Sequence, residues 1–302
     1  MGRKSCLEKR HALWNTASRL GLQESMGNPL LRPAEWINLV FFLSIIGIVV
    51  VLHRGRVRGA LAFGAAGVFA TLGGTFSAAL LPYDWSAMLR DWLPVPLVPL
   101  AYQQAGSLYT RPNLKLQNRL QRIDDFFARR FRALAPVVRS LHVTRYLEGA
   151  YLLAYPLVPL GLASLCFSDL DVPADDFWSV VLPSTYLCYV MLPFAPTLPP
   201  RLNGGSGSDL FFAGPRARTE GRRMNVWILD RLGIGANTFP SGHVAATTAA
   251  SLVVLEHRPI LGAVFLWVSA SIAVSVVIRR YHYLTDAVLA VAMVLVVWWA
   301  VG

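Results

Sequence analysis

The chain has 302 residues, of which 55% are hydrophobic and only 15% are charged, and its mean hydropathy is +0.47. Soluble domains carry about 25% charged residues and disordered chains are far less apolar, so both classes are excluded. Cys6, Cys166 and Cys188 are too few and too irregularly placed for a disulfide scaffold. On so apolar a chain, the net charge of +11 indicates loops facing anionic lipid and no nucleic acid partner. The composition predicts an all-α, polytopic membrane helical bundle.

The chain divides into four parts. Residues 1–35 are a polar N-terminal segment, 36–110 hold N-terminal transmembrane helices, 111–145 form an amphipathic interfacial segment, and 146–302 form a transmembrane core that carries the candidate catalytic residues. A helix needs about 20 mostly apolar residues to cross a bilayer. We therefore expect about eight spans: 36–52, 59–82, 92–108, 146–167, 177–196, 241–256, 259–278 and 284–301.

The interfacial segment has apolar residues at steps of three and four, which predicts one apolar stripe along a helix. They are Leu120, Ile123, Phe127, Phe131, Leu134, Val138 and Leu141, with arginines around them. We expect this helix to lie on the bilayer with its charges toward lipid phosphates. A lid over an active site is the alternative.

The orientation follows from the positive-inside rule. With eight spans, most of the 28 Lys and Arg residues fall on the side that also carries the polar motifs described next. That side is expected to face the cytoplasm of a multi-pass integral membrane protein, although basic residues that bind a ligand would add to the same excess.

The first polar motif is Phe239-Pro240-Ser241-Gly242-His243, which opens the 241–256 span. Gly242 lets a ligand approach the backbone closely, and the free N–H groups of a new helix favour an anion. His243 lies one turn into that helix. A helix cap with a hydrogen-bonded histidine is the structural alternative.

The second motif is Arg279-Arg280-Tyr281-His282-Tyr283-Leu284-Thr285-Asp286, before the last span. His282 and Asp286 are four residues apart, so on a helix they share one face. An aspartate bonded to one imidazole nitrogen leaves the other free to attack a substrate. A cation-flanked span boundary is the alternative.

The third motif is Pro196-Thr197-Leu198-Pro199-Pro200-Arg201. A rigid proline run would aim Arg201 from a fixed point, and a guanidinium binds phosphate oxygens bidentately. Alone, Arg201 could equally reach out to lipid headgroups. Together, two histidines, an aspartate and several arginines at one face of a membrane bundle favour phosphoryl transfer, because buried ionisable groups are costly and usually functional.

At these residues the chain resembles the type 2 phosphatidic acid phosphatase superfamily (lipid phosphate phosphatases and relatives) over about residues 146–295. The resemblance implies a phosphatase-like six-helix core in which His282 is the nucleophile, Asp286 orients it, and His243 is the general acid. Ser241, Gly242, Arg201 and Arg280 would hold phosphate oxygens, with Arg279 as the alternative to Arg280. Neither a cofactor nor a metal is implied, and no metal-ligand spacing is present.

The chain departs from the family pattern at two places. It has no lysine after Lys115, and Val276 stands where the third motif of the family has its arginine. Pro199-Pro200-Arg201 and Arg280-Tyr281-His282-Tyr283 instead resemble the branch that contains inositol phosphorylceramide synthases.

Three functions are therefore open. The first is a phosphatase acting on a phospholipid or another lipid phosphate, the second a phosphotransferase that moves a phospho-headgroup to a lipid hydroxyl, and the third a transporter with a phosphate-binding vestibule.

Glu148, three residues after Arg145, would pair with it at the membrane edge or accept hydrogen bonds from a polyol headgroup. The expected partners are this substrate and the lipid bilayer, and the sequence leaves a homo-oligomer open.

Overall fold

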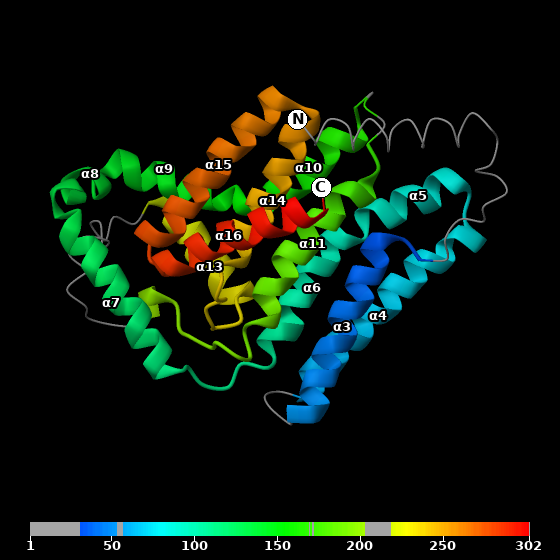
Figure 1. The fold of residues 1–302 in the computed structure, drawn as a ribbon, viewed down its shortest axis with the longest axis horizontal. Helices are drawn as coiled ribbons and strands as arrows, with labels where there is room; N and C mark the ends of the chain where they lie inside the picture. The colour runs from blue at the N-terminus through cyan, green and yellow to red at the C-terminus, as the bar shows by residue number, and fades with distance from the viewer. Residues whose placement is uncertain (1–30, 53–56, 169, 171, 203–218, 302) are drawn as a thin grey trace. The chain divides into compact units, whose positions relative to one another are not determined.

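The computed structural model describes residues 31–52, 57–168, 170, 172–202 and 219–301, so most of the predicted polar segment 1–35 lies outside the described residues. The elements below belong to one compact unit, Pro33–Gly302, which is distinct from the unit Met1–Arg32. Its described residues form helices joined by loops, with a single isolated β-bridge (Figure 1). The predicted all-α class is confirmed.

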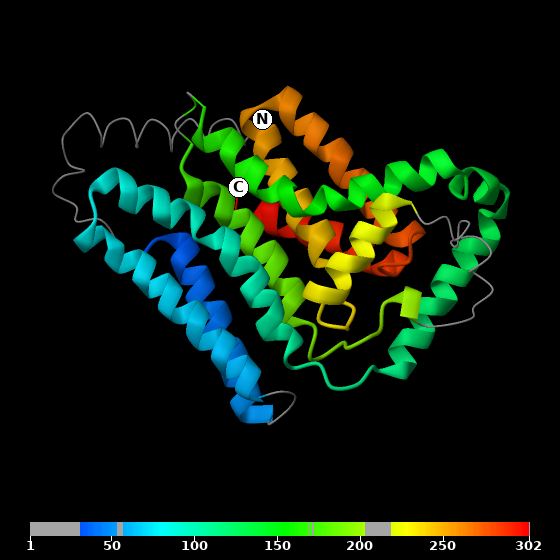
Figure 2. The ribbon, with the colours of Figure 1, turned by 180° about the vertical axis from the view of Figure 1, so that it is seen from behind.

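The N-terminal helices are α3 (Pro33–Leu52), α4 (Val57–Leu80), α5 (Tyr83–Trp92) and α6 (Pro94–Gly106). α3 and α4 lie side by side in both views (Figures 1 and 2). Gly67 permits their close approach, because a Cβ atom added there would lie only 2.4 Å from the Phe42 ring. A buried bidentate ion pair joins α5 to α3, with Arg90 Nε 2.6 Å from Glu35 Oε1 and Arg90 Nη2 2.7 Å from Glu35 Oε2.

The rest of the unit begins with α7 (Leu114–Arg130), the 3₁₀ turn η1 (Arg132–Leu134) and α8 (Ala135–Val138). The core helices are α9 (Leu141–Leu152), α10 (Ala154–Cys166), α11 (Ala174–Val190), α13 (Glu220–Leu232), α14 (Gly242–His257), α15 (Pro259–Ile278) and α16 (Leu284–Val301), with the 3₁₀ turn η2 (Pro200–Leu202) after α11. α14 packs against α10, α11, α15 and α16 and is buried along most of its length. It therefore forms the centre of the core.

Length and hydropathy support four or five of the eight expected spans. In the described part of the chain, α3, α4, α15 and α16 are long and apolar enough to cross a membrane, and α9 with α10 makes a fifth span if this pair, bent by 54°, is counted as one. The expected spans 92–108, 177–196 and 241–256 correspond to α6, α11 and α14, of 13, 17 and 16 residues. These three are shorter than the roughly 20 residues a span needs. α14 has the expected bounds to within one residue, and it is buried along most of its length because it lies at the centre of the core.

The predicted amphipathic helix is only partly present: α7 ends at Arg130, and the rest of the expected stripe lies on η1, α8 and the start of α9. The buried face of α7 is partly polar. Gln117, Leu120, Asp124 and Ala128 are buried against the protein, whereas the Phe126, Phe127 and Phe131 rings are exposed. Leu120 was expected on the lipid-facing stripe and lies inside instead. The exposed phenylalanines still form an apolar surface for lipid.

Candidate active site

The three motifs meet at one end of the core through backbone hydrogen bonds. Thr197 and Asn237 form an antiparallel bridge in which Asn237 N donates to Thr197 O at 2.8 Å. Arg201 N donates to Arg280 O at 3.0 Å, and Ser241 N donates to Asp286 O at 3.1 Å. Residues 40 to 79 positions apart in sequence are thereby held in one place.

His282 and Asp286 form the pair that their spacing predicts. His282 Nδ1 lies 3.3 Å from Asp286 Oδ2, and the same oxygen accepts from Tyr283 N at 3.0 Å and from Asn237 Nδ2 at 2.8 Å. Asp286 is fully buried, so its charge depends on these donors. With Nδ1 turned to the carboxylate, Nε2 is the nitrogen of His282 that remains for a ligand.

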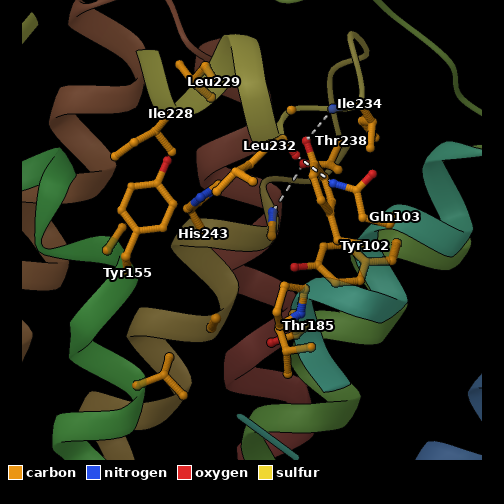
Figure 3. A pocket seen from close by; sticks show the side chains of 18 of the residues that line it. Tyr102, Gln103, Tyr155, Thr185, Ile228, Leu229, Leu232, Ile234, Thr238 and His243 are labelled. Carbon is orange, nitrogen blue, oxygen red and sulfur yellow. Dashed lines mark hydrogen bonds between the residues drawn. The ribbon is translucent and has the colours of Figure 1, made fainter. Parts of the chain in front are cut away.

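His282 lines a cavity of about 570 Å³ together with Arg201, Gly242 and His243. The His243 ring lies 5.5 Å from the rings of both Tyr151 and Tyr155. Figure 3 shows His243 between Tyr155 on one side and Tyr102 and Gln103 on the other, with Ile228, Leu229 and Leu232 above it. Two imidazoles and one guanidinium thus share one enclosed space.

Gly242 and Ser241, both predicted to hold phosphate, lie differently. Gly242 lines the cavity, and a Cβ atom there would lie 2.6 Å from Tyr189 Cε1, so only glycine allows this packing. Gly242 N already donates to Thr238 Oγ1 at 3.3 Å. The Ser241 hydroxyl is buried, does not line the cavity, and makes no hydrogen bond with the described part of the chain.

The two arginines before His282 are buried and turned away from the cavity. Arg279 Nε lies 2.6 Å from Glu148 Oε1. Arg280 has φ of 62°, and its Nη2 donates to Pro200 O at 3.1 Å. Neither lines the cavity. Of the three arginines predicted to bind phosphate, Arg201 is therefore the one that lines it.

Glu148 is not placed as either of its predicted roles requires. It is fully buried and does not line the cavity, and it forms ion pairs with Arg279 and Arg222 in the described part of the chain. Its Oε2 accepts from Tyr281 Oη at 2.8 Å and from Asn225 Nδ2 at 2.7 Å. The carboxylate therefore anchors α13 and the loop before His282.

Tyr281 is a site residue that sequence reasoning missed. Its ring stacks on Tyr151 with centroids 4.3 Å apart, and the Arg201 guanidinium lies over it at 5.8 Å. This cation–π contact helps to hold Arg201 at the cavity. The signal available in the sequence was its place beside His282.

Asn237 was also missed, because the sequence offers no local partner for it. Its Nδ2 bridges Thr197 Oγ1 at 3.0 Å and Asp286 Oδ2 at 2.8 Å, so one amide links two motifs.

The polar face of α7 supports the same loops. Gln117 Oε1 accepts from Leu198 N at 3.0 Å, and Asp124 Oδ1 accepts from Leu284 N at 3.0 Å at the start of α16. Burial, the largest cause, raises the pKa of Asp124 to about 7.

In the part of the chain that the structure describes, no group of three or more His, Cys, Asp or Glu side chains could hold a metal ion.

A family model described as the PAP2 superfamily matches residues 118–300, more than half of the chain. Comparison with the curated proteins and with the solved structures found no match. The matched region contains all three motifs and most of α7, and it excludes α3 to α6.

We predict that Asp124→Asn changes how stability depends on pH. Because the pKa of Asp124 in the folded protein lies above its ordinary value of 3.8, folding favours the protonated carboxyl group. The resulting stability is complete below about pH 4 and is lost as the pH rises toward 7. In thermal unfolding in detergent, the melting temperature of the variant relative to that of the wild type should therefore rise between these pH values. A constant difference across this range would contradict the prediction.

We also predict that Glu148→Ala strongly destabilises the protein, because it leaves two arginines beside an empty buried position. The expected loss is about 3–5 kcal/mol of unfolding free energy. Thermal or denaturant unfolding of the purified protein measures it. Glu220→Ala, an exposed change on α13, serves as the control and should change stability by less than about 0.5 kcal/mol.

Proposed function

The chain belongs to the PAP2 superfamily, as its motifs predict, and we propose that it is a membrane-embedded hydrolase that removes phosphate from a lipid phosphate or diphosphate through a phosphohistidine intermediate. The superfamily hydrolyses or transfers phosphate groups, and the apolar helices make this chain a membrane protein. The proposal concerns the substrate, the intermediate and the residues that act.

The His282–Asp286 pair supports the nucleophilic step. Nε2 of His282 attacks phosphorus, so that a P–N bond forms as the P–O bond to the lipid alcohol breaks. Asp286 holds the ring by Nδ1 and stabilises the positive charge that develops on it. Water then attacks the phosphohistidine, breaks the P–N bond and releases inorganic phosphate.

His243 and Arg201 supply the proton and the charge. His243 would donate a proton to the leaving lipid oxygen and later take one from the attacking water. Arg201 would neutralise the phosphoryl oxygens, which carry most of the negative charge in the transition state. The observation that carries the proposal is that His282, already paired with Asp286, shares one cavity with His243 and Arg201.

By the positive-inside count, the site would face the cytoplasm. Substrate would then come from the cytoplasmic leaflet.

A phosphotransferase is the second candidate, because the cavity is much larger than a phosphate group. At about 570 Å³ it has the size of pockets that enclose whole small molecules. A lipid alcohol in place of water would then take the phospho-headgroup.

Purified protein given a lipid phosphate, with and without an acceptor lipid, should release free phosphate in both cases if it is a hydrolase. A transferase would form a new phospholipid only when the acceptor is present.

We predict that His282→Ala abolishes the covalent intermediate. Brief exposure of wild-type protein to substrate labelled with radioactive phosphate should leave acid-labile label on the protein, and the variant should carry none. Phosphate release should fall by about 10³-fold or more, since no other group forms the intermediate.

His142→Ala is the matched control, because His142 is an exposed histidine on α9 away from the cavity. It should keep both the label and the activity. Normal phosphate release by His282→Ala would contradict the proposal, whereas no phosphate release by the wild-type protein would favour the transporter hypothesis.

A further inference from the structure

One surface of the chain combines exposed arginines with exposed phenylalanine rings. It lies on α7 and η1, and both views show α7 at the outer edge of its unit, away from α3 and α4 (Figures 1 and 2). The exposed basic residues between positions 118 and 132 are Arg119, Arg122, Arg129, Arg130 and Arg132. The acidic residues of the same stretch are Asp124, which is buried, and Asp125, which is half-buried and accepts from Gln121. The exposed charge is therefore positive.

The phenylalanine rings lie among these arginines. Phe126 and Phe131 are 59% and 44% exposed, and the Phe127 ring lies 5.8 Å from the first and 6.1 Å from the second. The Arg130 guanidinium lies 6.0 Å from the centre of the Phe131 ring. An apolar cluster beside guanidinium groups suits a partner in which hydrocarbon adjoins phosphate, which is the chemistry of a phospholipid surface. Inorganic phosphate would pair with the arginines but leave the rings in water.

The opposite face of α7 holds the loop that leads to Arg201. Asn113, which caps the start of α7, donates its backbone N–H to Pro196 O at 2.7 Å. One turn further on, Gln117 Oε1 accepts from Leu198 N at 3.0 Å. Because Pro196 and Leu198 belong to the same motif as Arg201, the position of α7 affects where this guanidinium lies.

The same face of α7 also holds the loop that carries His282. Gln121 Oε1 accepts from Arg280 Nη2 at 3.4 Å, and Asp124 Oδ1 accepts from Leu284 N at 3.0 Å. His282 lies between these two points of attachment. One helix therefore contacts the chain on both sides of the proposed nucleophile and also supports the loop of the arginine that would bind phosphate.

We propose that α7 and η1 form a binding site for the headgroups of anionic phospholipids, and that lipid bound there holds Arg201 and His282 in their relative positions. We call this site the arginine surface and define it by the five exposed arginines and the rings of Phe126, Phe127 and Phe131. None of these residues lines the cavity, so the lipid is a ligand of α7 and not the substrate. The inference goes beyond the proposed reaction, because it makes the charge of the bilayer a regulator of the enzyme.

The arginine surface has a measurable consequence. Each arginine near an anionic bilayer strengthens binding by about fivefold. Coupling between two sites of one protein commonly amounts to about 5- to 150-fold. Because the attraction acts between exposed charges, salt at about 1 M, where the Debye length is about 3 Å, should remove it.

The test places full-length protein in nanodiscs of phosphatidylcholine alone or of an equal mixture of phosphatidylcholine and phosphatidylglycerol. Both leaflets then carry the same lipids, so the result does not depend on the orientation of the protein. The substrate is 4-nitrophenyl phosphate, which is water-soluble and is used at saturation, so that kcat does not follow its local concentration. We expect kcat to be at least about fivefold higher in the mixture, and salt at about 1 M to remove the difference.

Replacing three arginines of the surface should remove this rise. The combined variant Arg129→Gln, Arg130→Gln and Arg132→Gln should keep the wild-type kcat in phosphatidylcholine and show no increase in the mixture. These side chains are exposed, so the variant should fold as the wild type does.

The matched control removes the same three charges elsewhere on the chain. It combines Arg58→Gln on α4 with Arg223→Gln and Arg231→Gln on α13, all at exposed positions. The control should keep the rise, because the arginine surface is intact.

Gln117→Leu separates the binding of lipid from its effect, because it removes the acceptor for Leu198 N and leaves the arginine surface unchanged. Hydrogen–deuterium exchange should show that phosphatidylglycerol still protects residues 118–132 of this variant, while kcat no longer rises. Asn118→Leu, at the exposed neighbouring position, is its control and should keep both the protection and the rise. A rise of wild-type size in folded Gln117→Leu would contradict the proposed coupling.

Hydrogen–deuterium exchange also separates this inference from the proposed function, since it needs no turnover. If the ester is hydrolysed in neither bilayer, but phosphatidylglycerol slows exchange at 118–132 and at 197–202 and 280–284 in the wild type and not in the three-arginine variant, the inference stands and the proposed reaction fails. If the ester is hydrolysed with the same kcat in both bilayers, or if the three-arginine variant and its control lose the rise equally, the reaction stands and the inference fails.

Two further additions test the identity of the ligand. Inorganic phosphate or RNA added to phosphatidylcholine nanodiscs should leave kcat unchanged or lower it by competition with the substrate. A rise equal to that given by phosphatidylglycerol, with either addition, would overturn the assignment of the arginine surface to the bilayer.

Discussion

One buried carboxylate, that of Asp286, holds the candidate site together. A buried charge needs hydrogen-bond donors, and those of His282, Tyr283 and Asn237 all meet at Oδ2 of Asp286. Its Oδ1 has no hydrogen-bond partner in the described part of the chain. Its backbone carbonyl also accepts from Ser241. The need to satisfy one group therefore draws the segments before α14 and α16 together, and the Thr197–Asn237 bridge adds the third motif.

Glu148 is a second buried carboxylate that holds several segments together, outside the cavity. It binds Arg279, Tyr281 and Asn225, so that α9, α13 and the loop before His282 share one buried carboxylate. Tyr281 and His282 are neighbours in the chain, and each side chain is held by a different carboxylate. The orientation of the proposed nucleophile is thus fixed from both sides, which is the preorganisation that phosphoryl transfer requires.

Sequence alone predicted what depends on local spacing. The four-residue step predicted the His282–Asp286 pair, and the long apolar runs predicted α3, α4, α15 and α16. The periodicity predicted a helix at α7 but not its end at Arg130. The partners of Glu148 and Asn237 could not be predicted, since they lie 40 to 133 residues away in sequence. Arg280 was assigned by its closeness to His282, but its positive φ turns it toward Pro200. α14 begins and ends within one residue of the expected 241–256.

The apolar walls of the cavity also bear on the choice between water and an alcohol as the second reactant. If the substrate chain occupies the space along α11, the apolar surface left for the chain of an acceptor lipid is that of Ile228, Leu229 and Leu232 on α13. Because both alcohols must approach the phosphorus in line with Nε2 of His282, the first alcohol must leave before the acceptor hydroxyl takes its place. A phosphohistidine intermediate permits this order, because the phosphoryl group stays on His282 while the cavity empties. Water needs no such exchange, so the geometry favours hydrolysis whenever the product alcohol leaves faster than an acceptor arrives.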